Sequence, residues 1–127
     1  MAKFAMLYLN DGVHEGKQLV PARGVHDSLQ TYSERVDTAG VRSGKSGRHF
    51  RDIGYGYQWW FARSGDHHFN YAAGHGGQLI VLLHGLDMVI VTTADPFFGQ
   101  DRHFESWKHE QAIIDMVGEF IGSLPKG

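Results

Sequence analysis

The sequence predicts an α+β protein: an antiparallel β-sheet meander flanked by helices, with a closing C-terminal helix, in a single domain over residues 1–127. Three observations predict it. Apolar residues recur at helical spacing near both ends of the chain, and segments with the pattern of β-strands lie in the middle. The connections between those segments are too short for parallel crossovers, so the sheet is antiparallel. The length is that of one domain, and this order of elements is typical of an α+β layer arrangement.

The N-terminal segment predicts two helices. Apolar residues recur at helical spacing over residues 2–10, and Asp11-Gly12 ends this helix. Pro21 opens a second helix, expected over residues 22–32. A long polar loop, residues 34–52, follows and carries several basic side chains. Loops of this length are often functional.

The middle of the chain predicts the sheet. Alternating aromatic residues predict one strand from Ile53 to Phe61, and residues 69–73 predict the strand that returns. Gln78–Leu83 is apolar almost throughout, which predicts a central strand covered on both faces. Residues 88–93 predict another strand of the same kind. An amphipathic pattern over residues 104–124 predicts the closing helix.

Composition excludes several classes of function. The net charge of −2 gives no overall field that would attract nucleic acid. No segment has the roughly 20 apolar residues needed to cross a membrane, and residues 1–9 lack a signal-peptide pattern. We therefore expect no nucleic-acid or membrane partner, and a cytoplasmic location by default. The absence of cysteine removes thiolate nucleophiles and cysteine-based metal sites.

Three motifs are weak. Residues 40–46, GVRSGKS, resemble a phosphate-binding loop but have one residue too few between the glycines and lie in a polar loop. The histidines lack the spacing of a helical zinc motif, so neither metal nor cofactor is expected, although a site assembled in space stays open. No Gly-x-Ser-x-Gly is present, which argues against an α/β-hydrolase nucleophile.

Two stretches, GYGYQWWF from Gly54 and YAAGHGGQLIVLLHGLDMVIVTTAD from Tyr71, resemble the C-terminal part of the serine β-lactamase-like hydrolases. That family includes class C β-lactamases, penicillin-binding-protein-like esterases and 6-aminohexanoate-dimer hydrolases. The resemblance extends over the whole chain and implies a partial β-lactamase/transpeptidase-like fold. It also implies an active site at the glycine-rich turn between Gly74 and Gln78.

The resemblance assigns this turn to the substrate side of an acyl-transfer site. It implies that His75, Gly76, Gly77 and Gln78 lie on the substrate-binding, oxyanion-hole side. Glycines there let a carbonyl or carboxylate approach the backbone, whose N–H groups stabilise an oxyanion. Further pocket candidates are the aromatic residues Tyr57, Trp59 and Tyr71.

The family's nucleophile motif, Ser-x-x-Lys, has no credible counterpart here. Ser123 and Lys126 match it by letter, but Pro125 between them breaks the helical geometry that the motif needs. Tyr8 and Asn10 match the family's Tyr-x-Asn motif by letter, but lie where a packing helix is expected. No catalytic residue is assigned, since nothing here forms the acyl-enzyme.

Three functions follow as hypotheses. The first is a hydrolase fragment or split subunit that is inactive alone and associates with itself or with a partner chain supplying the missing half. Its exposed apolar surface is expected at residues 54–60 and on the closing helix. The second is a non-catalytic ligand-binding or self-associating module, which holds a small carboxylate or acyl ligand. The third is an independent enzyme that uses histidines or a metal.

Overall fold

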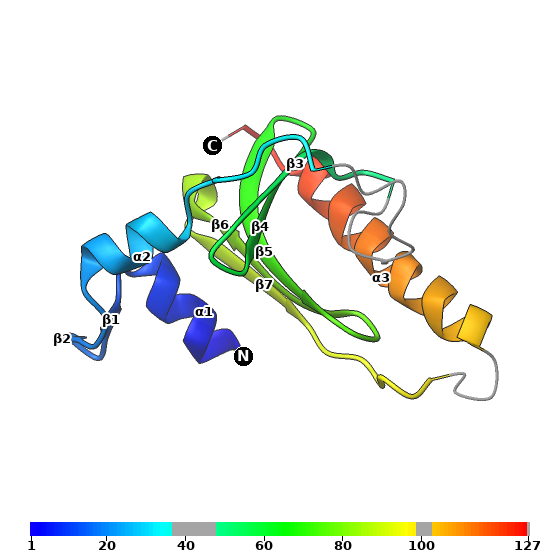
Figure 1. Ribbon diagram of the computed structural model, residues 1–127, viewed down its shortest axis with the longest axis horizontal. Helices are drawn as coiled ribbons and strands as arrows, with labels where there is room; N and C mark the ends of the chain where they lie inside the picture. Colours follow the sequence, from blue (N-terminus) through cyan, green and yellow to red (C-terminus); the bar gives the residue numbers. More distant parts are fainter. Residues whose placement is uncertain (37–47, 99–102, 127) are drawn as a thin grey trace.

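The computed structural model describes residues 1–36, 48–98 and 103–126 (Figure 1). A five-stranded antiparallel sheet has strands in the order of the chain, as the meander predicts. One face carries the helices α1 and α2, and the opposite face carries α3 (Figure 1). The helices are α1 (Ala2–Leu9), α2 (Ala22–Ser28) and α3 (His103–Ser123), with a 3₁₀ turn η1 (His84–Leu86). The strands are β1 (Val13–His14), β2 (Lys17–Gln18), β3 (Arg51–Gly56), β4 (Trp59–Ser64), β5 (His67–Gly74), β6 (Gln78–Leu83) and β7 (Met88–Thr92).

The α+β class, the antiparallel meander and the closing helix are therefore confirmed. The second helix ends earlier than expected, at Ser28, because the chain must leave it to run along β3. No helix in the described ranges is long and apolar enough to cross a membrane. The motif at residues 40–46 lies outside the described residues.

The single strand expected over residues 53–61 is wrong, because the chain reverses at Tyr57 and Gln58. Both residues adopt left-handed backbone conformations, with φ of 43° and 68°. They form a two-residue hairpin turn that pairs Gly56 with Trp59. Positive φ at both central positions matches the twist of the flanking strands, and Asn or Gly normally fills them. The aromatic alternation therefore continues across a turn, and the residue types at Tyr57 and Gln58 do not predict that turn.

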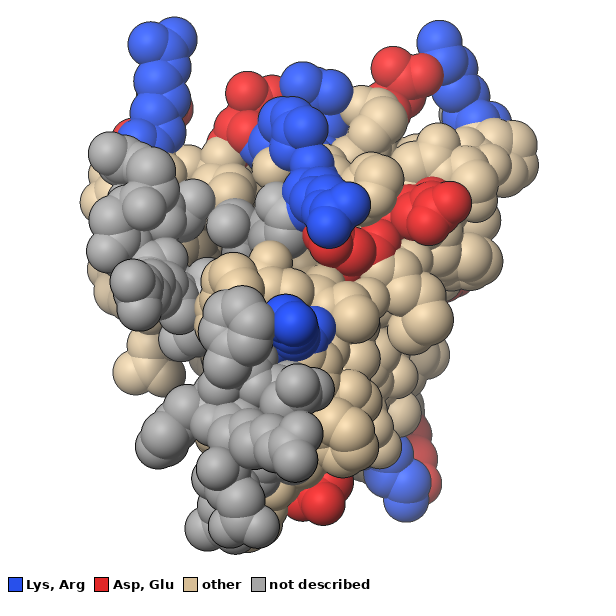
Figure 2. Space-filling view, turned by 90° about the vertical axis from the view of Figure 1, so that its right-hand side faces the viewer, with Lys and Arg blue, Asp and Glu red and all other residues tan. Residues whose placement is uncertain are grey.

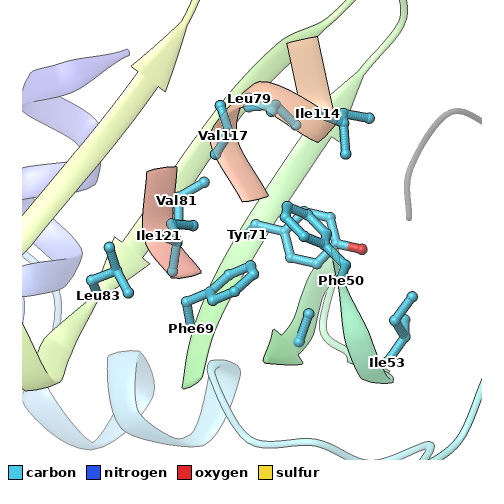
Figure 3. Packing of buried hydrophobic residues seen from close by; sticks show 11 residues of the cluster. Phe50, Ile53, Phe69, Tyr71, Leu79, Val81, Leu83, Ile114, Val117 and Ile121 are labelled. Carbon is cyan, nitrogen blue, oxygen red and sulfur yellow. The ribbon is translucent and has the colours of Figure 1, made fainter. Parts of the chain in front are cut away.

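Two apolar cores lie on the two faces of the sheet. The larger lies between the sheet and α3 and is built around the aromatic rings of Phe50, Phe69 and Tyr71 (Figure 3). The smaller lies beneath α1, where Ala5 packs with Trp59 and Leu82. The continuous apolarity of β6 follows from this arrangement, since its residues alternate between the two cores.

Two glycines of β3 allow the segment after α2 to pass close to this strand. A Cβ atom on Gly54 would lie 2.3 Å from Thr31 Cγ2, and one on Gly56 would lie 2.5 Å from Tyr32 Cδ2. The segment after α2 therefore packs directly on these backbones. Gly54, Gly56 and Trp59 are buried, whereas Tyr57 is exposed, so residues 54–60 provide only a small part of the exposed apolar surface that the sequence suggested.

The expectation that residues 88–93 form a central strand is also wrong. β7 is the last strand of the sheet, and it pairs with β6 alone among the described strands. All five of its residues are half-buried. Its apolar sequence reflects contacts with both cores, which hold Val89 on one face and Met88 and Ile90 on the other.

Candidate functional site: the glycine-rich turn

The residues that the resemblance assigned to a site form the turn between β5 and β6. Gly74 pairs with Gln78, and residues 75–77 connect the strands. Gly76 and Gly77 have φ of 86° and 99°, a backbone region that residues with a Cβ atom rarely adopt. His75, Gly76, Gly77 and Gln78 are thus brought together as one tight turn.

The small size of both glycines is also required by neighbouring parts of the chain. A Cβ atom on Gly76 would lie 2.6 Å from Pro96 Cα, and one on Gly77 would lie 2.5 Å from Ile113 Cδ1. The loop after β7 and the helix α3 therefore both press against the turn. The two glycines are needed for packing within the chain, whether or not a ligand approaches them.

Side chains on three elements fix this turn. Gln78 donates from Nε2 to the carbonyl of Ala94, and its Oε1 accepts from the Ala94 N–H at 3.2 Å. Thr92 Oγ1 donates to the carbonyl of Gly77 at 2.7 Å. Gln78 is therefore committed to the loop after β7 and does not point freely towards a substrate.

A buried carboxylate is the third side chain that holds this turn. Glu110 of α3 is only 7% exposed, and its Oε2 accepts a hydrogen bond from the Gly76 N–H at 3.1 Å. That bond occupies the Gly76 N–H, so this amide does not serve as an oxyanion donor in this conformation. Sequence reasoning missed Glu110, because its partner is a backbone amide 34 residues away.

The imidazole of His75 is the exposed group of the turn. His75 is exposed to solvent, whereas Gly76 and Gly77 beside it are buried. The ring nitrogens of an imidazole donate or accept hydrogen bonds. The turn therefore presents one exposed hydrogen-bonding side chain on a backbone that neighbouring parts of the chain contact closely.

The three aromatic pocket candidates do not meet at this turn. Tyr57 is 68% exposed in the β3–β4 turn, where its ring packs edge-on against Tyr32 at 4.9 Å between centroids. Trp59 is buried under α1 against Tyr8. Tyr71 is completely buried in the α3-side core (Figure 3), where burial raises the pKa of its hydroxyl. Trp59 and Tyr71 lie in separate cores on opposite faces of the sheet.

The residues that match the family's other motifs by letter do not form a catalytic pair. Ser123 Oγ donates to the carbonyl of Phe120 at 2.7 Å. Lys126 Nζ lies 3.4 Å from Asp66 Oδ2. Tyr8 packs between Phe4 and Trp59, which confirms that it is a packing residue.

Two adjoining hollows lie away from the turn. They measure about 430 and 310 Å³ and share Phe61, Asn70 and His84. The larger includes His68, whose ring stacks on Phe61 at 5.6 Å. No group of three or more potential metal-ligating side chains is found within the described ranges, so the histidine-metal hypothesis gains no geometric support.

Charged side chains on the α3 side of the molecule are mixed in sign. In Figure 2, Lys and Arg lie beside Asp and Glu on the part of this surface that the structure describes. One ion pair on this side shows this mixing: Arg48 Nε lies 3.5 Å from Asp115 Oδ2 of α3. The described part of this face therefore offers no concentrated basic patch.

The comparisons with known proteins assign no family. No protein-family model matches the sequence. No curated protein matches it either.

Proposed function

We propose that this chain is part of a β-lactamase-related serine hydrolase, an acyl-transfer enzyme acting on an ester, amide or β-lactam. In this proposal it supplies the substrate-binding side of the site and is inactive without a nucleophile from outside these 127 residues. The observation that carries the proposal is the turn at residues 75–77, where the exposed His75 lies beside two buried glycines with positive φ.

The hydrogen-bonding around the turn supports a preorganised site. Groups that stabilise a developing oxyanion act best when they need no rearrangement during the reaction. Here Thr92, Gln78 and Glu110 each bind the turn or the loop beside it. The role of His75 in the proposal is that of a hydrogen-bond donor or cation towards the carboxylate or carbonyl of the substrate.

The closing helix supports the need for a partner. Met116 and Phe120, one helical turn apart on α3, are 60% and 48% exposed. Large apolar side chains exposed next to one another are typical of surfaces that contact another polypeptide. The expectation of exposed apolar residues on the closing helix therefore agrees with the structure.

The test uses the purified chain with p-nitrophenyl acetate and a chromogenic cephalosporin, followed by intact mass spectrometry. We expect neither turnover nor an acyl adduct. We also expect the hydrolysed cephalosporin, a carboxylate, to shift the amide resonances of residues 75–78. The variant His75→Ala should weaken that binding, while His14→Ala, in the distant β1–β2 hairpin, serves as the matched control. A covalent adduct on any serine would overturn the assignment of the nucleophile to another chain or segment.

The alternative is a non-catalytic ligand-binding or self-associating module built on the same partial β-lactamase-like fold. The adjoining hollows around Phe61, Asn70 and His84 favour it, because they offer a ligand site without any nucleophile. Amide shifts at Asn70 and His84, with none at residues 75–78, would favour this alternative over the hydrolase proposal.

A further inference from the structure

The outer edge of β7 lacks the features that normally protect an edge strand. Its sequence, Met88-Val-Ile-Val-Thr92, contains no charge, proline or glycine. Its register with β6 is continuous from Leu79–Thr92 to Leu83–Met88, without a bulge. Natural edge strands carry charges, prolines or bulges because unpaired N–H and C=O groups recruit other strands. Along the part of the chain that the structure describes, no strand pairs with this outer edge.

The opposite edge of the sheet is occupied. Tyr55 of β3 donates its N–H to the carbonyl of Ser33 and accepts from the Ser33 N–H, both at 2.9 Å. Val36 N–H donates to the carbonyl of Ile53 at 2.8 Å. The segment after α2 therefore covers β3, which leaves β7 as the edge of this sheet that can accept a strand.

We propose that β7 pairs antiparallel with β7 of a second copy of this chain, joining the two sheets into one. The inference does not depend on the proposed hydrolase function. Because β3 is already covered, one copy cannot add its β7 to the β3 edge of another, so growth into open fibres is blocked. A self-complementary pairing of identical edges closes as a twofold dimer.

The charges at the ends of β7 favour the antiparallel arrangement. Asp87 precedes the strand, and Asp95 lies beyond its end. Parallel pairing in register would place Asp87 beside Asp87 of the second copy. Antiparallel pairing centred on Ile90 places Asp87 opposite the uncharged Thr93, while Ile90 lies opposite its own copy. Like charges directly across a strand pair are destabilising, so the antiparallel dimer is preferred.

The test measures mass in solution by light scattering across a dilution series of the complete chain. We expect about twice the chain mass of 14.2 kDa. Because Ile90 faces itself in the dimer, Ile90→Lys and Ile90→Glu should each weaken dimerisation by at least about tenfold. Mixing the two variants should restore a dimer that contains one copy of each. Circular dichroism confirms that each variant is folded.

The control distinguishes this edge from the exposed apolar residues on α3. Met116→Lys alters the α3 surface and should leave the dimer intact. A dimer that is lost in Met116→Lys but kept in Ile90→Lys would overturn the proposal. So would a wild-type chain that stays monomeric at high concentration with rapidly exchanging β7 amides, a measurement that does not depend on any variant folding.

Discussion

Glu110 of α3 accepts a hydrogen bond from the Gly76 N–H of the β5–β6 turn, with 3.1 Å between Oε2 and the amide nitrogen. The carboxylate is almost completely buried, and the amide belongs to a residue with φ of 86°. The bond ties the closing helix to the candidate site. It also determines which backbone donors of the turn remain for a ligand.

Replacing Glu110 should loosen the turn. Glu110→Ala leaves the Gly76 amide without its acceptor, and a buried donor without a partner costs about 1–3 kcal/mol. Glu110→Gln keeps an acceptor oxygen and should lose less stability. Denaturant unfolding gives the stability, and hydrogen exchange at Gly76 gives the local effect. The exposed Glu119 provides the control: Glu119→Ala should change stability by less than about 0.5 kcal/mol. Equal exchange at Gly76 in wild type and Glu110→Ala would contradict this role.

The second prediction concerns Gly77. Gly77→Ala places a Cβ atom against Ile113 and strains a backbone with φ of 99°. We expect a loss of about 2–4 kcal/mol, since overpacking and a disfavoured φ both contribute. Thermal and denaturant unfolding measure it. Gly85→Ala is the matched control, because no atom lies within 4 Å of a Cβ atom at that position. Similar stability for the two variants would show that Gly77 is not needed for packing.

The order of the meander could be predicted from the sequence, because short connections allow only antiparallel neighbours. The glycine-rich turn was also found, because Gly76-Gly77 marks a backbone that needs positive φ. The reversal at Tyr57 and Gln58 was missed, because neither residue type is typical of a turn. The edge position of β7 was missed for another reason. Apolar residues on both faces of a strand indicate that both faces are covered, but they do not indicate whether a further strand pairs with its outer edge.

The hydrogen bonds that hold the glycine-rich turn in place could not be predicted from the sequence. Glu110 and Ala94 contact the turn only through the tertiary fold, and one of the two groups in each hydrogen bond belongs to the backbone. Backbone donors are chemically alike from residue to residue, so no sequence pattern identifies which of them forms such a bond. The aromatic pocket candidates illustrate the same limit. Residue type alone did not separate the buried Tyr71 from the exposed Tyr57.

The third prediction concerns alkaline pH. Burial raises the pKa of the Tyr71 hydroxyl above its ordinary value near 10. Above pH 10 the unfolded chain releases this proton while the folded chain keeps it, so the folded state binds more protons. The free energy of unfolding should therefore be unaffected by Tyr71 below pH 10 and fall above it, by about 1.4 kcal/mol per pH unit.

Unfolding measured from pH 8 to 11 checks this dependence. Tyr71→Phe should make the decline above pH 10 shallower, whatever its effect on stability at neutral pH. If the Tyr71→Phe and wild-type slopes coincide, the hydroxyl of Tyr71 is not the group responsible.

The last prediction concerns the β3–β4 turn. Gln58 has φ of 68°, a conformation that costs a residue with a Cβ atom about 1–2 kcal/mol. Gln58→Gly removes this cost but adds flexibility to the unfolded chain, so we expect a net gain of about 0.5–1 kcal/mol. Gln58→Ala is the matched control: it removes the same exposed side chain, keeps the Cβ atom and should give no gain. Denaturant midpoints at a constant m-value measure both variants. If Gln58→Gly were less stable than Gln58→Ala, the positive φ of Gln58 would not be a source of strain in this turn.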